Sequence, residues 1–598
     1  MKRVVGVLFL ALALLVGVAS DHASREIPTP SASRETLTEF LAGVADTLLR
    51  QSPETITTRG VSQKLGVRND TLDSLVLDAT GESYAPLERA LERIESSDLM
   101  QETDRDRRAI EVFAWWLRDA IAGRPFQRDT SLVSTYMTSA PQRLVWFMTE
   151  IHPLRTEVDA EDYLSRLGQI PARFDQLVVR LEQSEQVRAL PPRFLLERAA
   201  DEIEAIGRGP AETSKFYTRF AERLDAMTDI GSDAQRALLD NAARCVSEVV
   251  GPAYVGLAEK VRAFAARATD DAGVWKVPDG EAYYAYLLRA YTTTDMTADE
   301  IYQFGLREVA RLQDEIRAAA ADLGFDPSLS LADLFAEIRA ACGVVSGDDA
   351  VRDCRTLVAE AGVLARPAFL RWPTRNVAVE AGEDIAYFVE GAEDGSRPGA
   401  FFVPVEQVRP TFSLRSLTYH ETIPGHFLQT AIAQESALPP FLGGVAFSAF
   451  SEGWATYAER LAWELGAYED DPYGNLGRLQ EELFRAARLV VDPGIHARRW
   501  TYEEAVRYMM QATGLAEATV RDEVERYIVT PGQAVAYGVG FFKFLELRER
   551  ARQALGPAFN LAEFHDAILA YGSVPLPVLE EIVDDFIVSH LPAPAGNP

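Results

Sequence analysis

Two histidines and a glutamate stand close together in the segment Tyr419–His426, which reads Tyr-His-Glu-Thr-Ile-Pro-Gly-His. Histidine nitrogens bind zinc, and a glutamate beside a histidine ligand acts on water in zinc peptidases with the motif His-Glu-x-x-His. In that motif the histidines are four residues apart and share one helix face. Here the second histidine comes two residues late. On an unbroken helix of about 3.6 residues per turn, this step turns His426 roughly 240° away from His420, so the two could not bind one ion.

The same segment contains residues that interrupt a helix. Pro424 cannot donate the helical hydrogen bond to the carbonyl of His420, and it disfavours helical geometry at Ile423. Gly425 tolerates the backbone angles that a kink requires. We therefore predict that one helix ends near Ile423 and that the next begins at Pro424. His426 would then lie in the first turn of the second helix, where both imidazoles could reach one zinc ion.

A third protein ligand is needed for a catalytic zinc site with one open coordination position. The segment Phe450–Arg460 is predicted to be a helix and offers Glu452 as that ligand. Glu459 follows seven residues later and faces the same side of the helix. It could accept a hydrogen bond from a ligating histidine. Alternatively, Glu452 is one of the many solvated acidic residues of this chain.

Four motifs in order give the chain a family resemblance. They are Tyr419–His426, Ser-Glu-Gly-Trp-Ala at 451–455, Asp-Pro-Gly-Ile-His at 492–496 and Pro-Gly-Gln-Ala-Val-Ala-Tyr at 531–537. With these motifs, most of the chain resembles the bacterial domain-of-unknown-function family 885, regarded as metallopeptidases related to helical zinc carboxypeptidases and oligopeptidases. The resemblance implies a mostly helical, zincin-like fold around a deep cleft. It also implies zinc bound by His420, His426 and Glu452.

Further side chains in the later motifs could assist catalysis. His496 and Tyr537 could each donate a hydrogen bond to the oxyanion that develops at an attacked carbonyl. Alternatively, His496 is a loop histidine after a Pro-Gly turn signal, and Tyr537 is a core aromatic residue. Arg488, Arg498 and Arg499 are interpreted as surface charges, or as a bidentate clamp for a substrate carboxylate.

The elements that must position these residues are mainly helices. Apolar residues recur at helical spacing over 35–51, and a capping-box pattern at 297–300 opens a long helix, so helices are expected over most of residues 35–370. Short β-prone runs at 376–379, 385–389 and 400–403 predict a small sheet in the C-terminal half. The strand at 400–403 could hold an extended peptide by backbone pairing at its edge. We expect one helical metallopeptidase domain over 35–593, two-lobed, with lobes of roughly 35–365 and 366–593.

The N-terminus has the layout of an export signal. Lys2 and Arg3 precede an uncharged apolar run from Val4 to Ala19, so residues 1–20 are predicted to be a signal peptide cleaved near Ser20. The mature protein would be periplasmic or secreted without stable membrane insertion, unless the signal remains as an uncleaved anchor. The sequence has no cysteine near the cleavage point, so it gives no support for a lipid anchor. After export, Cys342 and Cys354 could form a disulfide, or remain free, buried thiols.

Composition restricts the partners. The chain has 598 residues, a hydrophobic content of 47% and a formal net charge of -30. A polyanion is repelled by phosphate backbones, which argues against nucleic acid as a partner. The histidine–glutamate motif, the family resemblance and the export signal together predict an exported zinc metallopeptidase that hydrolyses oligopeptides, with Glu421 as the general base. Two alternatives remain open, a non-catalytic peptide-binding protein with a vestigial metal site and a zinc amidase acting on a non-peptide substrate. The sequence indicates neither the oligomeric state nor whether cleavage is internal or terminal.

Overall fold

Helix-capping residues mark where several of the helices begin. In the computed structural model, which describes residues 35–77, 81–127, 131–383 and 385–591, the expected capping box at Thr297 and Glu300 is present and opens helix α13. Thr36 and Glu39 open α1 in the same way, because each side chain satisfies a backbone N–H of the other residue. The described chain is mostly α-helical, as expected.

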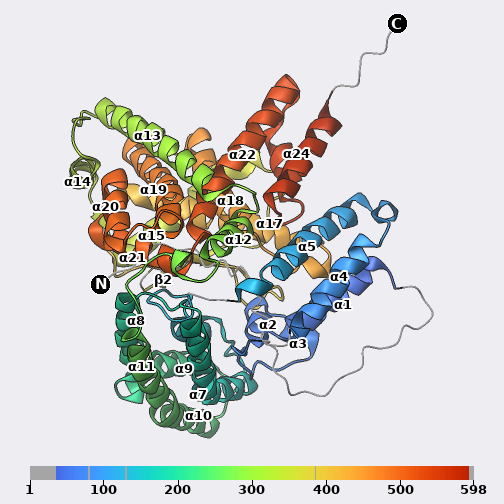
Figure 1. The fold of residues 1–598 in the computed structure, drawn as a ribbon, viewed down its shortest axis with the longest axis vertical. Helices are drawn as coiled ribbons and strands as arrows, with labels where there is room; N and C mark the ends of the chain where they lie inside the picture. Colours follow the sequence, from blue (N-terminus) through green and yellow to red (C-terminus); the bar gives the residue numbers. More distant parts are fainter. Residues whose placement is uncertain (1–34, 78–80, 128–130, 384, 592–598) are drawn as a thin grey trace.

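The helices can be followed along the chain by colour in Figure 1, as a first run up to Thr292 and a second run from Ala298. The first run comprises α1 (Leu37–Leu49), α2 (Pro53–Arg59), α3 (Ser62–Leu65), α4 (Ala85–Glu95), α5 (Asp104–Ala122), α6 (Ala140–Trp146), α7 (Glu157–Gln186), α8 (Arg193–Gly207), α9 (Lys215–Asp225), α10 (Ser232–Cys245), α11 (Gly251–Ala265) and α12 (Gly280–Thr292). The second run comprises α13 (Ala298–Asp322), α14 (Leu331–Cys342), α15 (Gly347–Ala365), α16 (Leu414–Glu421), α17 (His426–Glu435), α18 (Ser448–Glu464), α19 (Pro472–His496), α20 (Tyr502–Thr513), α21 (Glu517–Val529), α22 (Gln533–Leu555), α23 (Leu561–Leu569) and α24 (Leu576–His590).

The expected small sheet is confirmed. It has the strand order β2 (Ala378–Gly382), β4 (Ala400–Pro404), β3 (Tyr387–Val389), with β4 parallel to β2 and antiparallel to β3. A separate two-stranded pair joins β1 (Val344–Val345) to β5 (Arg409–Pro410). Because β4 is the central strand, both of its edges are already paired. The expectation that a peptide pairs with the edge of this strand is therefore wrong.

The hydrophobic cores combine residues from distant parts of the chain. One core joins α1, α4 and α5 to α18 and α22–α24. A second lies among α6–α11 and includes Ile385, Tyr387 and Val389, and in Figure 1 the helices α7–α11 form a group below the rest. A third joins α13 and α14 to α19–α21. All three cores contain residues from both sides of the position 365/366 at which the two lobes were expected to meet.

The expectations for the signal peptide, for membrane insertion and for the cysteines have separate outcomes. The signal peptide expected at residues 1–20 lies outside the described residues. Across the part of the chain that the structure describes, none of the helices has the length and apolar character needed to cross a membrane. Cys245, Cys342 and Cys354 are all free thiols, so the alternative of a disulfide between Cys342 and Cys354 is not realised.

Candidate metal centre

The expected helix break lies between α16 and α17. α16 ends at Glu421, two residues before the expected end, and α17 begins at His426. Within the break Gly425 donates its N–H to the carbonyl of Tyr419 at 3.0 Å. A side chain on Gly425 would overlap the carbonyl oxygen of His420, so glycine is required at this close approach. Trp454 of α18 donates its indole N–H to the carbonyl of Pro424 at 3.0 Å, which satisfies a backbone group that the break leaves without a helical partner.

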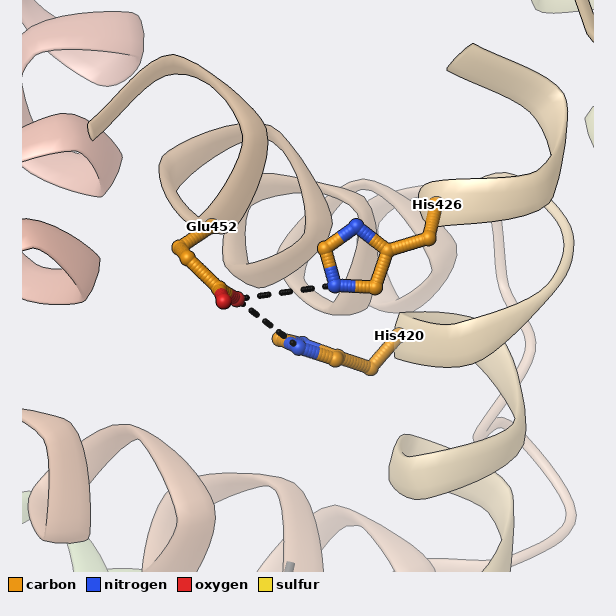
Figure 2. A group of neighbouring side chains, drawn as sticks. All are labelled: His420, His426 and Glu452. Atoms are coloured by element: carbon orange, nitrogen blue, oxygen red, sulfur yellow. Dashed lines mark ion pairs between the residues drawn. The ribbon is translucent and has the colours of Figure 1, made fainter. Parts of the chain in front are cut away.

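The break brings both histidines toward Glu452 of α18 (Figure 2). Nε2 of His420 lies 3.7 Å from Oε2 of Glu452, and Nε2 of His426 lies 3.5 Å from the same oxygen. One donor atom from each of the three residues lies within 4.8 Å of the others. Ligands held at about 2.0 to 2.1 Å around a tetrahedral zinc ion are roughly 3.3 Å apart. The two distances from the histidines to Glu452 are close to that spacing.

Several polar atoms of this centre are buried without a hydrogen-bond partner among the described residues. They are both carboxylate oxygens of Glu421, both of Glu452, and Nε2 of His420. Burial of charged groups without compensation is costly, so these orphaned oxygens and the imidazole nitrogen suit a bound cation. Burial also raises the pKa of Glu421 to about 8. Burial alone would raise the pKa of Glu452 as well, but contacts with His420 and His426 outweigh it and lower that pKa to about 2.

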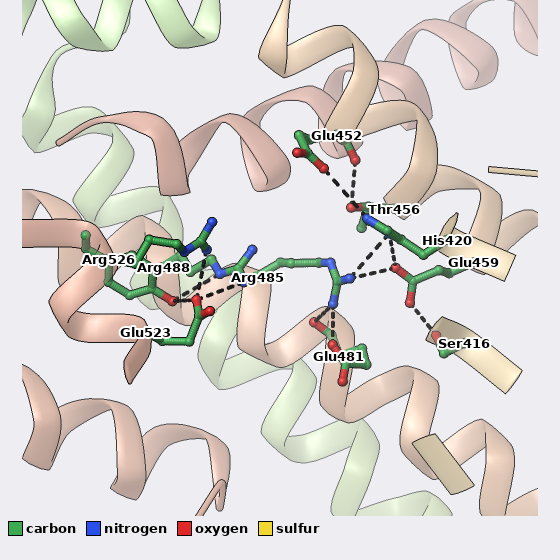
Figure 3. A network of polar contacts seen from close by, with 11 residues as sticks. Ser416, His420, Glu452, Thr456, Glu459, Glu481, Arg485, Arg488, Glu523 and Arg526 are labelled. Atoms are coloured by element: carbon green, nitrogen blue, oxygen red, sulfur yellow. Dashed lines mark hydrogen bonds and ion pairs between the residues drawn. The ribbon is translucent and has the colours of Figure 1, made fainter. Parts of the chain in front are cut away.

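Glu459 orients His420, as expected from the spacing. Nδ1 of His420 donates a hydrogen bond to Oε1 of Glu459 at 2.8 Å (Figure 3). Ser416 donates its hydroxyl to the other oxygen of Glu459, and Arg485 lies 3.0 Å from Oε1. With the proton of the neutral imidazole on Nδ1, the lone pair of Nε2 would be available to a metal ion on the side of Glu452.

Close packing of α18 on α22 places Tyr537 in this centre. A side chain on Gly453 of α18 would overlap the backbone of Gly540 on α22, and one on Gly540 would overlap the backbone of Ala449. The ring of Tyr537, one turn before Gly540, stacks on the imidazole of His420 with 6.4 Å between centroids and 12° between planes. Burial and the neighbouring carboxylate of Glu452 raise the pKa of Tyr537, so its hydroxyl keeps its proton.

Both ring nitrogens of His496 form hydrogen bonds with the backbone. Its Nδ1 accepts a hydrogen bond from the backbone N–H of Val274 at 3.2 Å, and its Nε2 donates to the carbonyl of Tyr527 at 3.0 Å. These contacts occupy both ring nitrogens and favour a structural role over oxyanion binding. The expected turn before His496 is also wrong, because Asp492, Pro493 and Gly494 lie inside α19.

The arginines nominated from the sequence divide between the surface and the interior. Arg498 and Arg499 are exposed, and Arg498 pairs with Asp299. Arg488 is only 1% exposed, so its interpretation as a surface charge is wrong. Sequence reasoning also missed Arg485, which is buried beside Glu459. No signal in the sequence marks it, because the burial of an arginine depends on elements that are distant along the chain.

A cavity of about 170 Å³ reaches the residues around Tyr537. Arg526 and Glu523 of α21 line it, and the guanidinium carbon of Arg526 lies 5.9 Å from the centroid of the Tyr537 ring. Its other walls include Tyr136 and a set of apolar and aromatic side chains: Met137, Val145, Trp146, Leu195, Ile385, Tyr387, Phe402 and Val529. His420, His426 and Glu452 are not part of this lining.

Comparisons with known proteins relate this architecture to one family and to two solved structures. The model of a family described as "Bacterial protein of unknown function (DUF885)" matches residues 53–583. A protein from Colwellia psychrerythraea is 30% identical, with a TM-score of 0.87 over 92% of this chain and 99% of its own. A protein from Shewanella oneidensis is 20% identical with a TM-score of 0.68 and the same coverage, which shows a shared fold. Both are described as a "putative lipoprotein", the second of unknown function. A comparison with curated proteins gave no match.

Proposed function

This chain belongs to the bacterial protein family of unknown function DUF885, and we propose that it is an exported zinc-dependent peptidase acting on oligopeptides. One observation carries the proposal. Donor atoms of His420, His426 and Glu452 converge within 4.8 Å of one another in the interior. Glu421, the residue next to a ligand, has both carboxylate oxygens buried and without a hydrogen-bond partner in the described chain.

The number of converging donors supports a catalytic centre. Structural zinc sites are closed by four protein ligands, whereas catalytic sites have three and leave one position open. Within the described ranges the metal-like cluster has three members, His420, His426 and Glu452. A vestigial or structural site would also have no use for a carboxylate at Glu421. This favours the peptidase over a non-catalytic peptide-binding protein.

Each residue of the centre has a role in peptide hydrolysis. A zinc ion held by His420, His426 and Glu452 would supply an activated water and polarise the scissile carbonyl. Glu421 accepts the proton of the attacking water and later delivers it to the leaving amine. Tyr537 stacks on His420 and supplies a protonated hydroxyl as donor for the developing oxyanion. Glu459 and Arg485 hold His420 in the orientation that binding requires.

Export is the second part of the proposal. Lys2, Arg3 and the apolar run up to Ala19 have the layout of a signal peptide. The similar proteins from Colwellia and Shewanella are each described as a "putative lipoprotein", which fits an exported family. N-terminal sequencing of protein from the envelope fraction is expected to begin near Asp21, and a cytosolic chain that starts at Met1 would contradict export.

A peptide-library digest tests the activity. Purified full-length protein is incubated with a mixed oligopeptide library with and without a chelator, and new termini are identified by mass spectrometry. We expect cleavage that the chelator abolishes and that added zinc restores, together with about one zinc ion per chain. A protein that binds zinc but leaves every peptide intact would contradict the peptidase assignment.

A further inference from the structure

Two buried arginines, Arg488 and Arg526, share the carboxylate of Glu523. Arg526 and Glu523 line the cavity, and the part that they line is called its inner end. The guanidinium of Arg488 lies 3.1 Å from Oε2 of Glu523, and that of Arg526 lies 2.8 Å from the same oxygen (Figure 3). Tyr527 donates its hydroxyl to this oxygen as well. All three charged side chains are at most 2% exposed. Two positive charges therefore face one negative charge in the interior, which leaves an excess positive charge.

Both guanidinium groups keep an unused donor. Nη1 of Arg488 and Nε of Arg526 are buried and have no hydrogen-bond partner among the residues that the structure describes. A buried donor without an acceptor is costly, and more so when it is charged. Arginine N–H groups bind carboxylates with particular strength and geometric selectivity. The unused donors thus indicate a site for an anionic group.

The other carboxylates around this cavity are already matched by cations. Glu150 pairs with Arg219, and Glu383 pairs with Lys215. Asp522 and Glu525 both pair with Arg198. Among the acidic residues of the lining, Glu523 is the one that two arginines contact, so the excess positive charge is confined to the inner end of the cavity.

This inner end is close to the metal centre. The guanidinium carbon of Arg488 lies 4.4 Å from the centroid of the Tyr537 ring, and that ring stacks in turn on the imidazole of His420. Arg526 reaches the same ring and also lines the cavity. One aromatic ring therefore separates the arginine pair from a proposed metal ligand.

We infer that Arg488 and Arg526 bind a carboxylate of the substrate, and that this carboxylate is the free C-terminus of a peptide. The inference rests on the proposed peptidase function and makes the protein an exopeptidase that works from the carboxyl end. An anion held one ring away from the metal centre restricts attack to a peptide bond near that anion. The apolar wall at Trp146, Tyr387 and Phe402 faces the same cavity and suits the apolar side chains of the bound peptide.

Binding to a non-hydrolysing variant tests the site without depending on turnover. The full-length Glu421→Gln protein is titrated by calorimetry with one apolar N-acetylated tetrapeptide in three forms: a free carboxyl terminus, a C-terminal amide, and the amide with one internal glutamate. We expect the free acid to bind at least about tenfold more tightly than the amide. If the internal glutamate restores tight binding, the site takes a side-chain carboxylate and the C-terminal assignment is overturned. Equal binding of all three peptides overturns the carboxylate site.

Substitutions test whether Arg488 and Arg526 cause the preference for the free acid. Arg526→Met and Arg488→Met are each expected to bring the ratio of acid to amide affinity close to one, with zinc content unchanged. Arg478→Met is the matched control, since Arg478 is also buried on α19 with an unused guanidinium nitrogen but pairs with Glu482 instead of Glu523. If the control loses discrimination while Arg526→Met retains it, the assignment is wrong. The wild-type comparison of acid with amide needs no variant, so a substitution that fails to fold leaves the inference testable.

The two proposals fail in different ways. A wild-type protein that hydrolyses free acid and amide equally, in a chelator-sensitive reaction, retains the peptidase function and loses the carboxylate site. A protein that hydrolyses neither peptide but binds the free acid selectively loses the peptidase function and keeps the site.

Discussion

At the residue scale, substitution of Glu421 and substitution of a proposed metal ligand should have different effects. The first should remove only activity, whereas the second should also remove zinc. Glu421→Gln keeps the size of the side chain but cannot accept a proton, so kcat should fall by roughly 10² to 10⁴-fold while about one zinc ion per chain remains bound. His426→Ala removes an electron-pair donor, so zinc content and activity should fall together. Atomic absorption on dialysed protein and initial rates on one peptide measure both. Full hydrolysis by the Gln variant, or full zinc content in His426→Ala, would contradict the assignment of roles.

Substitutions of Tyr537 and His496 should affect different properties, kcat for the first and stability for the second. Tyr537→Phe should lower kcat by an amount equivalent to about 2.7 to 4 kcal/mol with zinc content intact, because the change removes a donor at the metal centre. His496→Ala removes two backbone contacts from the interior and should destabilise the fold by about 2 to 4 kcal/mol. Steady-state kinetics and urea unfolding of both variants separate these effects. A Phe variant with unchanged kcat would return Tyr537 to the hydrophobic core.

At the residue scale, the sequence predicts those groups whose chemistry is unusual for their setting. Histidines that flank a glutamate and a Pro-Gly pair have no packing purpose, which makes His420 and His426 visible. The buried arginines were not visible in this way. A single sequence cannot distinguish Arg488, which is enclosed by the chain, from Arg498, which is exposed, because burial depends on elements that are distant in sequence.

At the scale of the elements, the interruption of a helix predicted from proline was confirmed at Pro424 and was wrong at Pro493. The break before His426 was predictable because Pro424 and Gly425 both oppose a continuous helix. The same reasoning fails at Pro493, which lies within α19. Tertiary contacts override the local preference there, because Asp492 accepts the N–H of Gly532 and Gly494 packs directly against Trp500. The strands of the sheet were likewise predictable, whereas their order was not, because pairing of β4 with β2 and β3 is decided by long-range contacts.

The close contact between α18 and α22 leads to a prediction at this scale. Gly540→Ala places a methyl group against the backbone of α18, so it should cost about 1 to 3 kcal/mol of stability and weaken zinc binding by displacing Glu452. Gly168→Ala on α7 is the control, since that position is exposed and has open space beside it. It should leave zinc binding unchanged and raise stability by up to about 1 kcal/mol. Thermal unfolding and a zinc competition titration are the measurements. Identical behaviour of the two variants would contradict a role for the glycine contact.

For the whole molecule, buried histidines predict how stability depends on pH. Burial, aided by Arg166, lowers the pKa of His152 from 6.5 to about 3. Burial also lowers the pKa of His496 to about 4 and that of His565 to about 3. Below pH 6.5 the unfolded chain takes up protons that the folded chain does not. These residues therefore contribute full stability above about pH 6.5, and that contribution decreases as the pH falls toward 4 or 3.

His152→Gln isolates one such contribution. Glutamine can still accept from Arg166 and donate to the carbonyl of Asp159, but it does not titrate. The wild-type protein should lose its stability advantage over the variant as the pH falls from about 7.5 to 5, with a slope that approaches about 1.4 kcal/mol per pH unit. Chemical unfolding at several pH values in this range measures the difference. Parallel profiles for the two proteins would show that His152 does not titrate on unfolding.

The contacts between the first helices and α24 bear on how the chain folds during its synthesis. Arg108 of α5 pairs with Glu581 and Asp585 of α24, and one hydrophobic core joins α1, α4 and α5 to α24. A ribosome releases the N-terminal helices first, so their apolar faces have no complete partner until the last helix has been synthesised. Contacts of such long sequence separation form late and slowly. We therefore expect the first helices to remain incompletely folded until α24 has been synthesised, so that their apolar faces stay exposed to aggregation for longer than those of helices with near neighbours in sequence.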